Sequence, residues 1–114
     1  MSNPVMWHNP RCSKSRETLK LLEEKGYTPE VRLYLDNPPD PEELERAAAE
    51  LGLGPMEMIR RKEAPAEGLS DDMAPGMLFA AMAADPILIE RPVVFYKGRA
   101  AIGRPPENVL SILD

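Results

Sequence analysis

Cysteine and histidine are scarce in this sequence, and each shortage excludes a class of protein. The chain of 114 residues has one cysteine and one histidine. A lone cysteine cannot form an internal disulfide, so the chain is not a disulfide-stabilised secreted domain, and we expect a cytoplasmic protein. With so few ligands, no Cys/His spacing suits a metal ion, and we expect no metal site.

Long apolar runs and an excess of positive charge are also missing. No run approaches the roughly 20 apolar residues of a membrane span, and no signal-peptide pattern is present, so we expect no membrane partner. The formal net charge is −5, from 14 Lys and Arg against 19 Asp and Glu. Since affinity for a phosphate backbone comes from clustered Lys and Arg, we expect no nucleic-acid partner.

The first third of the chain predicts a strand, a helix and a second strand. The apolar run Val5–Trp7 predicts a buried strand. A helix is predicted from about Ser13 to the pair Lys25-Gly26, which is typical of a helix C-terminus. Residues 30–35 alternate as a half-buried strand does. The residues expected on its buried side are Val31, Leu33 and Leu35.

The middle of the chain predicts a helical insert over about residues 40–85. A first helix follows Asp40-Pro41, an N-cap acid with proline at the first helical position, and it ends at Gly52. The other predicted helices span Pro55 to about Arg61 and Asp72 to Ala84.

The last third predicts two strands and a helix. Val93–Tyr96 and Arg99–Ile102 flank the two-residue hairpin connection Lys97-Gly98, and Pro105-Pro106 begins a final helix. The order of elements predicts an α/β fold, a thioredoxin-like mixed sheet of about four strands with a helical insertion between its βαβ and ββα halves. The length fits a single domain spanning residues 1–114.

Cys12 lies in the most basic stretch of the chain, at the predicted start of the first helix. Its basic neighbours are Arg11, Lys14 and Arg16. A helix N-terminus and nearby positive charges favour the thiolate and lower a cysteine pKa from about 8.5 into the range ~3.5–7.5. The pattern predicts a reactive thiol. The alternative is that Cys12 is a small buried apolar residue.

His8 and Ser15 complete the stretch around the thiol. A protonated His8 would also favour the thiolate, although a lone histidine is equally consistent with a structural role. Ser15 stands where a C-x-x-C motif has its second cysteine, so Cys12 has no partner thiol within the chain.

These motifs resemble those of the glutaredoxin-coupled arsenate reductases, a family with a thioredoxin-like fold. The stretch His8-Asn9-Pro10-x-Cys12-x-x-Ser15-Arg16 is similar to the family's active-site loop. The resemblance covers about Val5 to Leu113. The other matching signatures are residues 34–39, Ile59-Arg60, residues 87–92 and Gly103-Arg104-Pro105.

The resemblance implies roles for particular residues. Cys12 is the implied nucleophile, with His8 tuning the thiolate or its hydrogen-bond network. The positions that match the oxyanion-binding arginines of the family are Arg60, Arg91 and Arg104. Arg61 and Lys62 follow Arg60, so the cation that serves the site is left open here. The implied supporting residues are Ser15, Arg16 and Pro92, and the Arg91-Pro92 bond is expected to be cis.

The resemblance also implies the reaction and its partners. Arsenate, a small oxyanion, is reduced to arsenite through a covalent adduct on Cys12. Glutathione is the implied co-substrate and glutaredoxin the implied protein partner, with no bound cofactor.

Two other functions stay open. One is a monothiol transferase that acts on glutathionylated substrates. The other is a thiol regulator of the Spx type, which binds RNA polymerase. Regulators of that type usually carry C-x-x-C as a redox switch, so Ser15 argues against this function.

Overall fold

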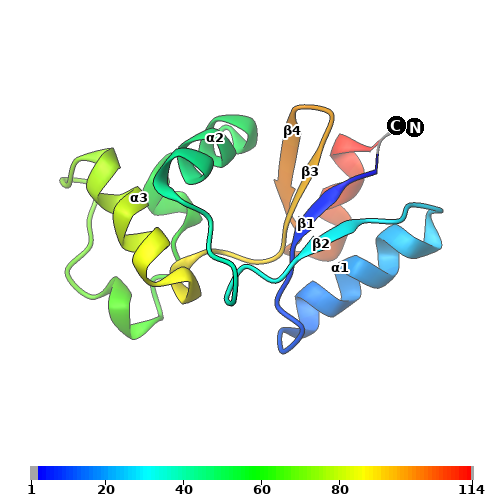
Figure 1. Cartoon of the computed structure of the whole chain (residues 1–114), viewed down its shortest axis with the longest axis horizontal. Coiled ribbons are helices and arrows are strands. Elements are labelled where there is room, and N and C mark those ends of the chain that lie inside the picture. The colour runs from blue at the N-terminus through cyan, green and yellow to red at the C-terminus, as the bar shows by residue number, and fades with distance from the viewer. Residues whose placement is uncertain (1–2, 114) are drawn as a thin grey trace. The chain divides into compact units, whose positions relative to one another are not determined.

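The computed structural model describes residues 3–113, and the chain divides into two compact units (Figure 1). The first, called the sheet unit below, joins the segment that ends at Tyr34 to the segment that begins at Arg91. The second, called the insert unit, is Leu35–Glu90 and encloses the stretch 40–85 that was predicted to be helical.

A four-stranded mixed sheet forms the centre of the sheet unit. The strands are β1 (Val5–Trp7), β2 (Glu30–Arg32), β3 (Val93–Tyr96) and β4 (Arg99–Ile102), in the order β2-β1-β3-β4. β1 runs parallel to β2 and antiparallel to β3, and β4 is antiparallel to β3. The predicted α/β fold with a mixed sheet of about four strands is therefore confirmed.

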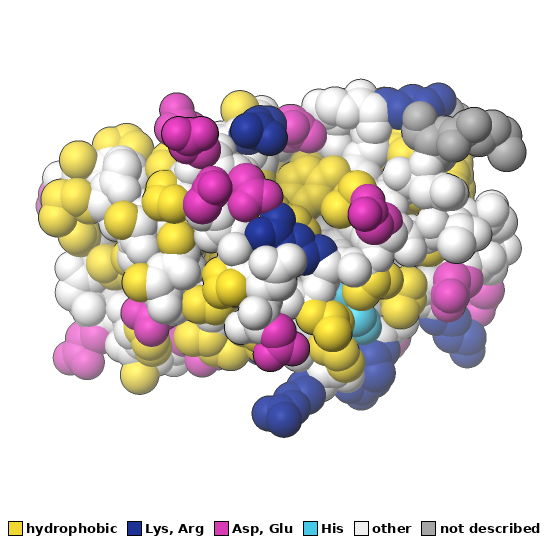
Figure 2. Space-filling model, viewed as in Figure 1, with side chains coloured by type: hydrophobic (Ala, Val, Ile, Leu, Met, Phe, Trp, Pro, Cys, Tyr) yellow, Lys and Arg dark blue, Asp and Glu magenta, His cyan; other side chains and the backbone are white. Residues whose placement is uncertain are grey.

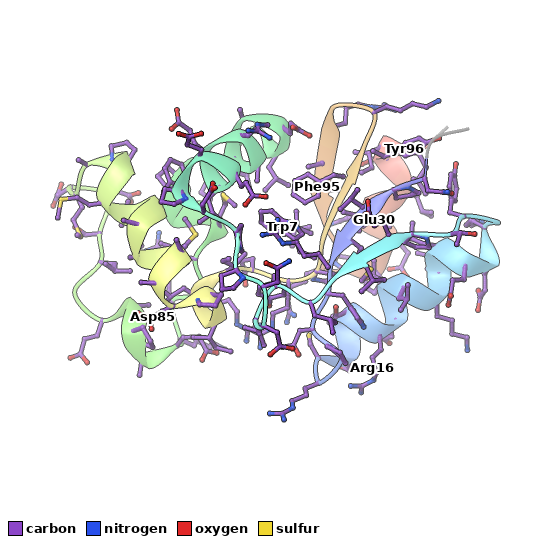
Figure 3. The ribbon with its side chains drawn as sticks, in the orientation of Figure 1. Trp7, Arg16, Glu30, Asp85, Phe95 and Tyr96 are labelled. Atoms are coloured by element: carbon purple, nitrogen blue, oxygen red, sulfur yellow. The ribbon has the colours of Figure 1, made fainter. Side chains whose placement is uncertain are left out.

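Helix α1 (Ser13–Glu24) and the 3₁₀ helix η4 (Pro106–Ile112) pack with the sheet around one apolar core. The buried residues of this core are Met6, Leu22, Val94, Tyr96, Val109 and Ile112. The expected final helix is thus present, but as a 3₁₀ helix. On the sheet, the Trp7 and Phe95 rings lie 4.8 Å apart between centroids (Figure 3).

β2 differs from its prediction in length and burial. It ends at Arg32, and Val31 and Leu33 are 41% and 42% exposed, whereas Tyr34 is fully buried. β2 is an edge strand that pairs only with β1, so the sheet holds just three of its residues. The prediction that Val31 and Leu33 share a buried side was wrong, because alternation shows that side chains share a side but not which side is covered.

The insert unit contains α2 (Pro41–Leu51), α3 (Pro75–Ala84) and the 3₁₀ helices η1 (Pro55–Met58), η2 (Ala64–Ala66) and η3 (Pro86–Leu88). The Asp40 carboxylate accepts from Glu43 N at 2.8 Å, which starts α2 as predicted, and Gly52 ends it with φ +71°. α3 begins at Pro75 rather than Asp72, because proline suits the first turn of a helix and disrupts its interior. In residues 3–113, no helix has the length and apolar character that a membrane span needs.

Within the insert unit, the segments around Ile59 and Ile89 pair in antiparallel orientation. An isolated bridge pairs Ile59 with Ile89, and Arg60 N donates to Leu88 O at 2.7 Å. The backbone at Arg60 is therefore fixed by its own unit.

On the face in Figure 2, acidic, basic and apolar side chains are interspersed.

Candidate active site around Cys12

Cys12 is the N-cap residue of α1. Its backbone is extended (φ −95°, ψ 122°), and its carbonyl accepts the first helical hydrogen bond from Arg16 N at 3.0 Å. Its own N–H donates to Asn9 O at 3.0 Å, which closes the turn between β1 and α1. The partly exposed thiol therefore lies at the end of a helix where backbone N–H groups favour an anion, as the sequence predicted.

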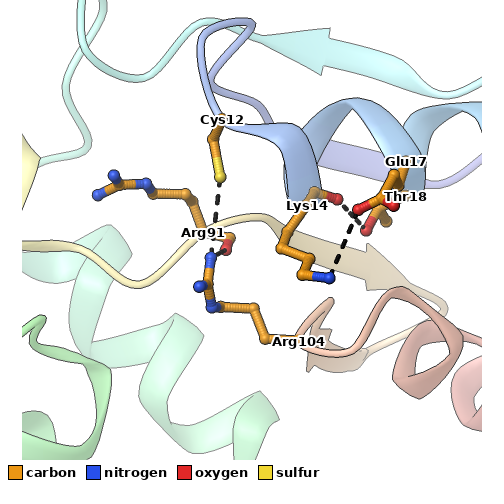
Figure 4. A network of polar contacts seen from close by, with 6 residues as sticks. All are labelled: Cys12, Lys14, Glu17, Thr18, Arg91 and Arg104. Carbon is orange, nitrogen blue, oxygen red and sulfur yellow. Dashed lines mark hydrogen bonds and ion pairs between the residues drawn. The ribbon is translucent and has the colours of Figure 1, made fainter.

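Two arginines of the sheet unit lie beside the thiol (Figure 4). Arg104 Nη1 is 3.8 Å from Cys12 Sγ and donates to Arg91 O at 3.4 Å. The Nε and Nη1 atoms of Arg91 are buried and have no hydrogen-bond partner among the residues that the structure describes. A guanidinium whose buried donors are open is a ready partner for an oxyanion, because its planar fork matches two oxygens.

The pKa of the Cys12 thiol lies below its ordinary value. Burial raises this pKa, but the backbone N–H of Ser15, the side chain and charge of Arg91, and the backbone N–H of Lys14 together lower it by more. The N–H groups belong to the first turn of α1. Helix and arginine thus favour the thiolate, which is the nucleophilic form.

His8, Asn9 and Ser15 form a buried hydrogen-bonded cluster. His8 Nδ1 lies 2.6 Å from Ser15 Oγ, and Asn9 N donates to the same oxygen at 3.0 Å. Burial, and then the positive charge of Arg16, lower the pKa of His8 below 6.5. The neutral form of His8 therefore predominates at pH 7. Of the two expected roles, the structure favours the hydrogen-bond network over a charge that assists the thiolate.

The other predicted supporting residues lie at the edges of this loop. Arg16 is exposed, and its Nη1 donates to Pro10 O at 2.8 Å, so it braces the turn that carries Cys12. Arg91-Pro92 is a cis peptide, as predicted. Arg104-Pro105 is also cis, which the sequence analysis missed although the same Arg-Pro dipeptide occurs there.

Arg60 belongs to the insert unit, whereas Cys12, Arg91 and Arg104 belong to the sheet unit. Its Nε lacks a hydrogen bond but lies 3.6 Å from the Glu63 carboxylate, and its side chain is 20% exposed. Arg61, the neighbouring candidate, is exposed. Of the two side chains, that of Arg60 is the more buried and has an acidic partner. Its role in oxyanion binding stays a prediction.

A groove of about 290 Å³, which was not predicted from the sequence, runs along α1 in the sheet unit. Its lining carries charges of both signs: Lys14, Glu17, Lys20, Leu21, Glu24, Pro105, Pro106 and Glu107. Lys14 pairs with Glu17 at 3.7 Å, and Lys20 with Glu24 at 4.0 Å. The spacing of these lysines and glutamates by three and four residues was the available signal.

A metal ion has no candidate site in the part of the chain that the structure describes. Within residues 3–113, no three His, Cys, Asp or Glu side chains are grouped so that they could hold one.

Comparison with known proteins shows the family of the chain. The model of the ArsC family matches residues 7–112. The chain is 46% identical to the uncharacterised protein YfgD of Escherichia coli over 95% of its length and 94% of the relative's. It is 44% identical to an arsenate reductase of Haemophilus influenzae, with 96% of this chain and 97% of the relative covered.

A solved structure agrees with these sequence matches. The structure of an arsenate reductase from Vibrio cholerae superposes with a TM-score of 0.93 at 50% sequence identity, covering 97% of this chain and 98% of the other. Fold and sequence thus agree along nearly the whole chain.

Proposed function

The chain belongs to the ArsC family, and from that premise we propose that it is an arsenate reductase whose nucleophile is Cys12. The observation that carries this proposal is the position of Cys12, at the N-terminus of α1 with Arg104 Nη1 3.8 Å from its sulfur. The open donors of Arg91 supply a second cation for the oxyanion. Two relatives named arsenate reductase are similar over nearly their full length.

In the first step the Cys12 thiolate attacks the arsenic atom of arsenate. A sulfur–arsenic bond forms, and one arsenate oxygen leaves as water after taking up protons. Arsenic stays in its +5 state, because no electrons have yet been transferred. Arg91 and Arg104 hold the remaining oxygens by charge-assisted hydrogen bonds, with Arg60 as the third predicted ligand.

The reduction itself needs two thiols from outside the chain, because Ser15 cannot serve as a second sulfur. Glutathione replaces another oxygen on arsenic, again releasing water. A glutaredoxin thiolate then attacks the glutathione sulfur. The bond between that sulfur and arsenic breaks, and its electron pair passes to arsenic. The products are arsenic in its +3 state, still bound to Cys12, and a mixed disulfide of glutaredoxin and glutathione. Water releases arsenite and restores Cys12.

The groove along α1 supports a peptide thiol as the co-substrate. Glutathione carries two carboxylates and one ammonium group, and the groove offers lysines and glutamates in alternation. It is lined by Lys14 and Pro105, which neighbour Cys12 and Arg104 in the chain. We place the reaction in the cytoplasm, where the glutathione pool is reduced.

A coupled assay tests this proposal. Arsenate, glutathione, glutaredoxin and its NADPH-dependent reductase should give steady NADPH oxidation with the wild-type chain, and Cys12→Ser should abolish it. Omitting glutathione should also stop turnover, while Ser111→Ala, an exposed substitution in η4, should leave it unchanged. If the chain turns over a glutathionylated peptide but does not turn over arsenate, its function is that of a monothiol transferase and not of a reductase.

A further inference from the structure

Gly103 occupies a position where no side chain fits. An ideal Cβ on this residue would lie 2.5 Å from Thr18 Oγ1 and 2.8 Å from Pro92 Cγ. Both distances are shorter than a real contact allows. Most other glycines of the chain have open space there; Gly54 meets one carboxylate oxygen at 3.5 Å. Gly103 therefore serves the close approach of three segments and not a special backbone angle.

The two neighbours of Gly103 cannot easily move away. Thr18 is fully buried, and its Oγ1 donates to Lys14 O at 2.8 Å. Pro92 is buried too, and its carbonyl accepts from Gly103 N at 2.9 Å. Because packed interiors have few voids, an added methyl group here has to displace backbone.

Each of these contacts leads directly to the thiol site. Thr18 is hydrogen-bonded to Lys14, in the first turn of α1, while Pro92 directly follows Arg91. Gly103 itself precedes Arg104, whose Nη1 lies 3.8 Å from Cys12 Sγ (Figure 4). The three segments that surround the sulfur therefore meet at the Gly103 backbone.

We propose that Gly103 is a positioning residue: its missing side chain lets α1, the Arg91-Pro92 segment and the Arg104 loop close around the Cys12 sulfur. Its effect on the thiol is independent of the substrate. Its effect on oxyanion binding rests on the proposed function, since Arg91 and Arg104 are there the arsenate ligands.

Gly103→Ala should push these segments apart. The Lys14 and Ser15 N–H groups and Arg91 all lower the pKa of Cys12, so that pKa should rise towards the free-thiol value. Thiol alkylation at pH 7 should slow accordingly. The KM for arsenate should increase by roughly tenfold or more, because charge-assisted hydrogen bonds to the anion lengthen.

Two further variants separate positioning from stability. Gly76→Ala is the matched control, because a Cβ there meets nothing within 4 Å, and its thiol pKa and KM should equal those of wild type. Thr18→Ala removes the nearest of the two obstructing side chains. In a double-mutant cycle, Gly103→Ala should therefore raise the thiol pKa less in the Thr18→Ala background than alone.

Folding is followed by circular dichroism and urea unfolding, and thiol pKa by the pH dependence of alkylation. A folded Gly103→Ala chain with a wild-type thiol pKa overturns the proposal, and so does a chain that stays unfolded in both backgrounds. If wild type does not reduce arsenate, the proposed function fails, while the thiol pKa still tests the role of Gly103.

Discussion

The two units hold their arginines in different ways. In the sheet unit, Arg91 keeps Nε and Nη1 buried without a hydrogen-bond partner within the described residues, and Arg104 reaches towards the thiol. In the insert unit, the buried Nε of Arg60 also lacks a hydrogen bond, but the Glu63 carboxylate lies 3.6 Å from it and balances its charge. A buried donor without a partner costs about 1–3 kcal/mol, so the sheet unit holds Arg91 at the expense of stability. Such a cost is typical of a binding site, whereas the Arg60 pair is an ordinary local contact.

Arg91→Ala should have the largest effect of the arginine substitutions. It removes a ligand of the anion and a cation that lowers the pKa of Cys12, so the KM for arsenate should rise roughly tenfold or more and the thiol pKa should rise. Stability should hold or improve, because two unsatisfied donors disappear. Coupled kinetics, alkylation against pH and urea unfolding measure the three effects. An unchanged KM would remove Arg91 from the site.

Arg60→Ala sharpens the contrast between the units. If Arg60 binds arsenate, kcat/KM should fall by about tenfold. The thiol pKa should stay at its wild-type value, since Arg60 is not among the groups that lower it. Arg61→Ala, at an exposed neighbouring position, is the matched control. A larger loss with Arg61→Ala than with Arg60→Ala would show that Arg61, and not Arg60, binds the anion.

The smallest expected effect is the pH dependence of stability that comes from His8. Titration of His8 tests whether the buried cluster of the sheet unit is neutral. The chain has one histidine, so a single imidazole signal can be followed by NMR. Its midpoint should lie below 6.5. The folded pKa is lowered, so the unfolded chain binds more protons, and stability present above pH 6.5 should decline as pH falls through the folded pKa. A midpoint above 6.5 would restore a charged His8 as an aid to the thiolate.

Local chemistry made much of the fold predictable from sequence. The capping box of Asp40 and Glu43, the left-handed Gly52 and the Lys97-Gly98 connection each depend on a few adjacent residues. Cys12 at the start of a helix was predictable for the same reason. Arg91 and Arg104 came from the resemblance, because nothing within their own segments indicates that they meet at a sulfur.

Features that depend on distant neighbours were not predictable. The exposure of Val31 and Leu33 is set by what covers an edge strand. The contact between His8 and Ser15 spans seven residues, and the close approach at Gly103 joins segments about 85 residues apart in sequence. Only the folded chain shows these contacts.

The N-cap position of Cys12 affects the stability of the first turn of α1. Helices are usually capped by a Ser, Thr, Asp or Asn oxygen, and the Cys12 side chain makes no capping hydrogen bond. A neutral thiol thus leaves the first amides of α1 more open to local fraying, and the thiolate restores the missing negative charge. Because the pKa lies below 9.0, this contribution is complete above that pH and is lost as pH falls through the folded pKa. The ionisation that readies the sulfur for attack therefore also closes the end of the helix that carries it.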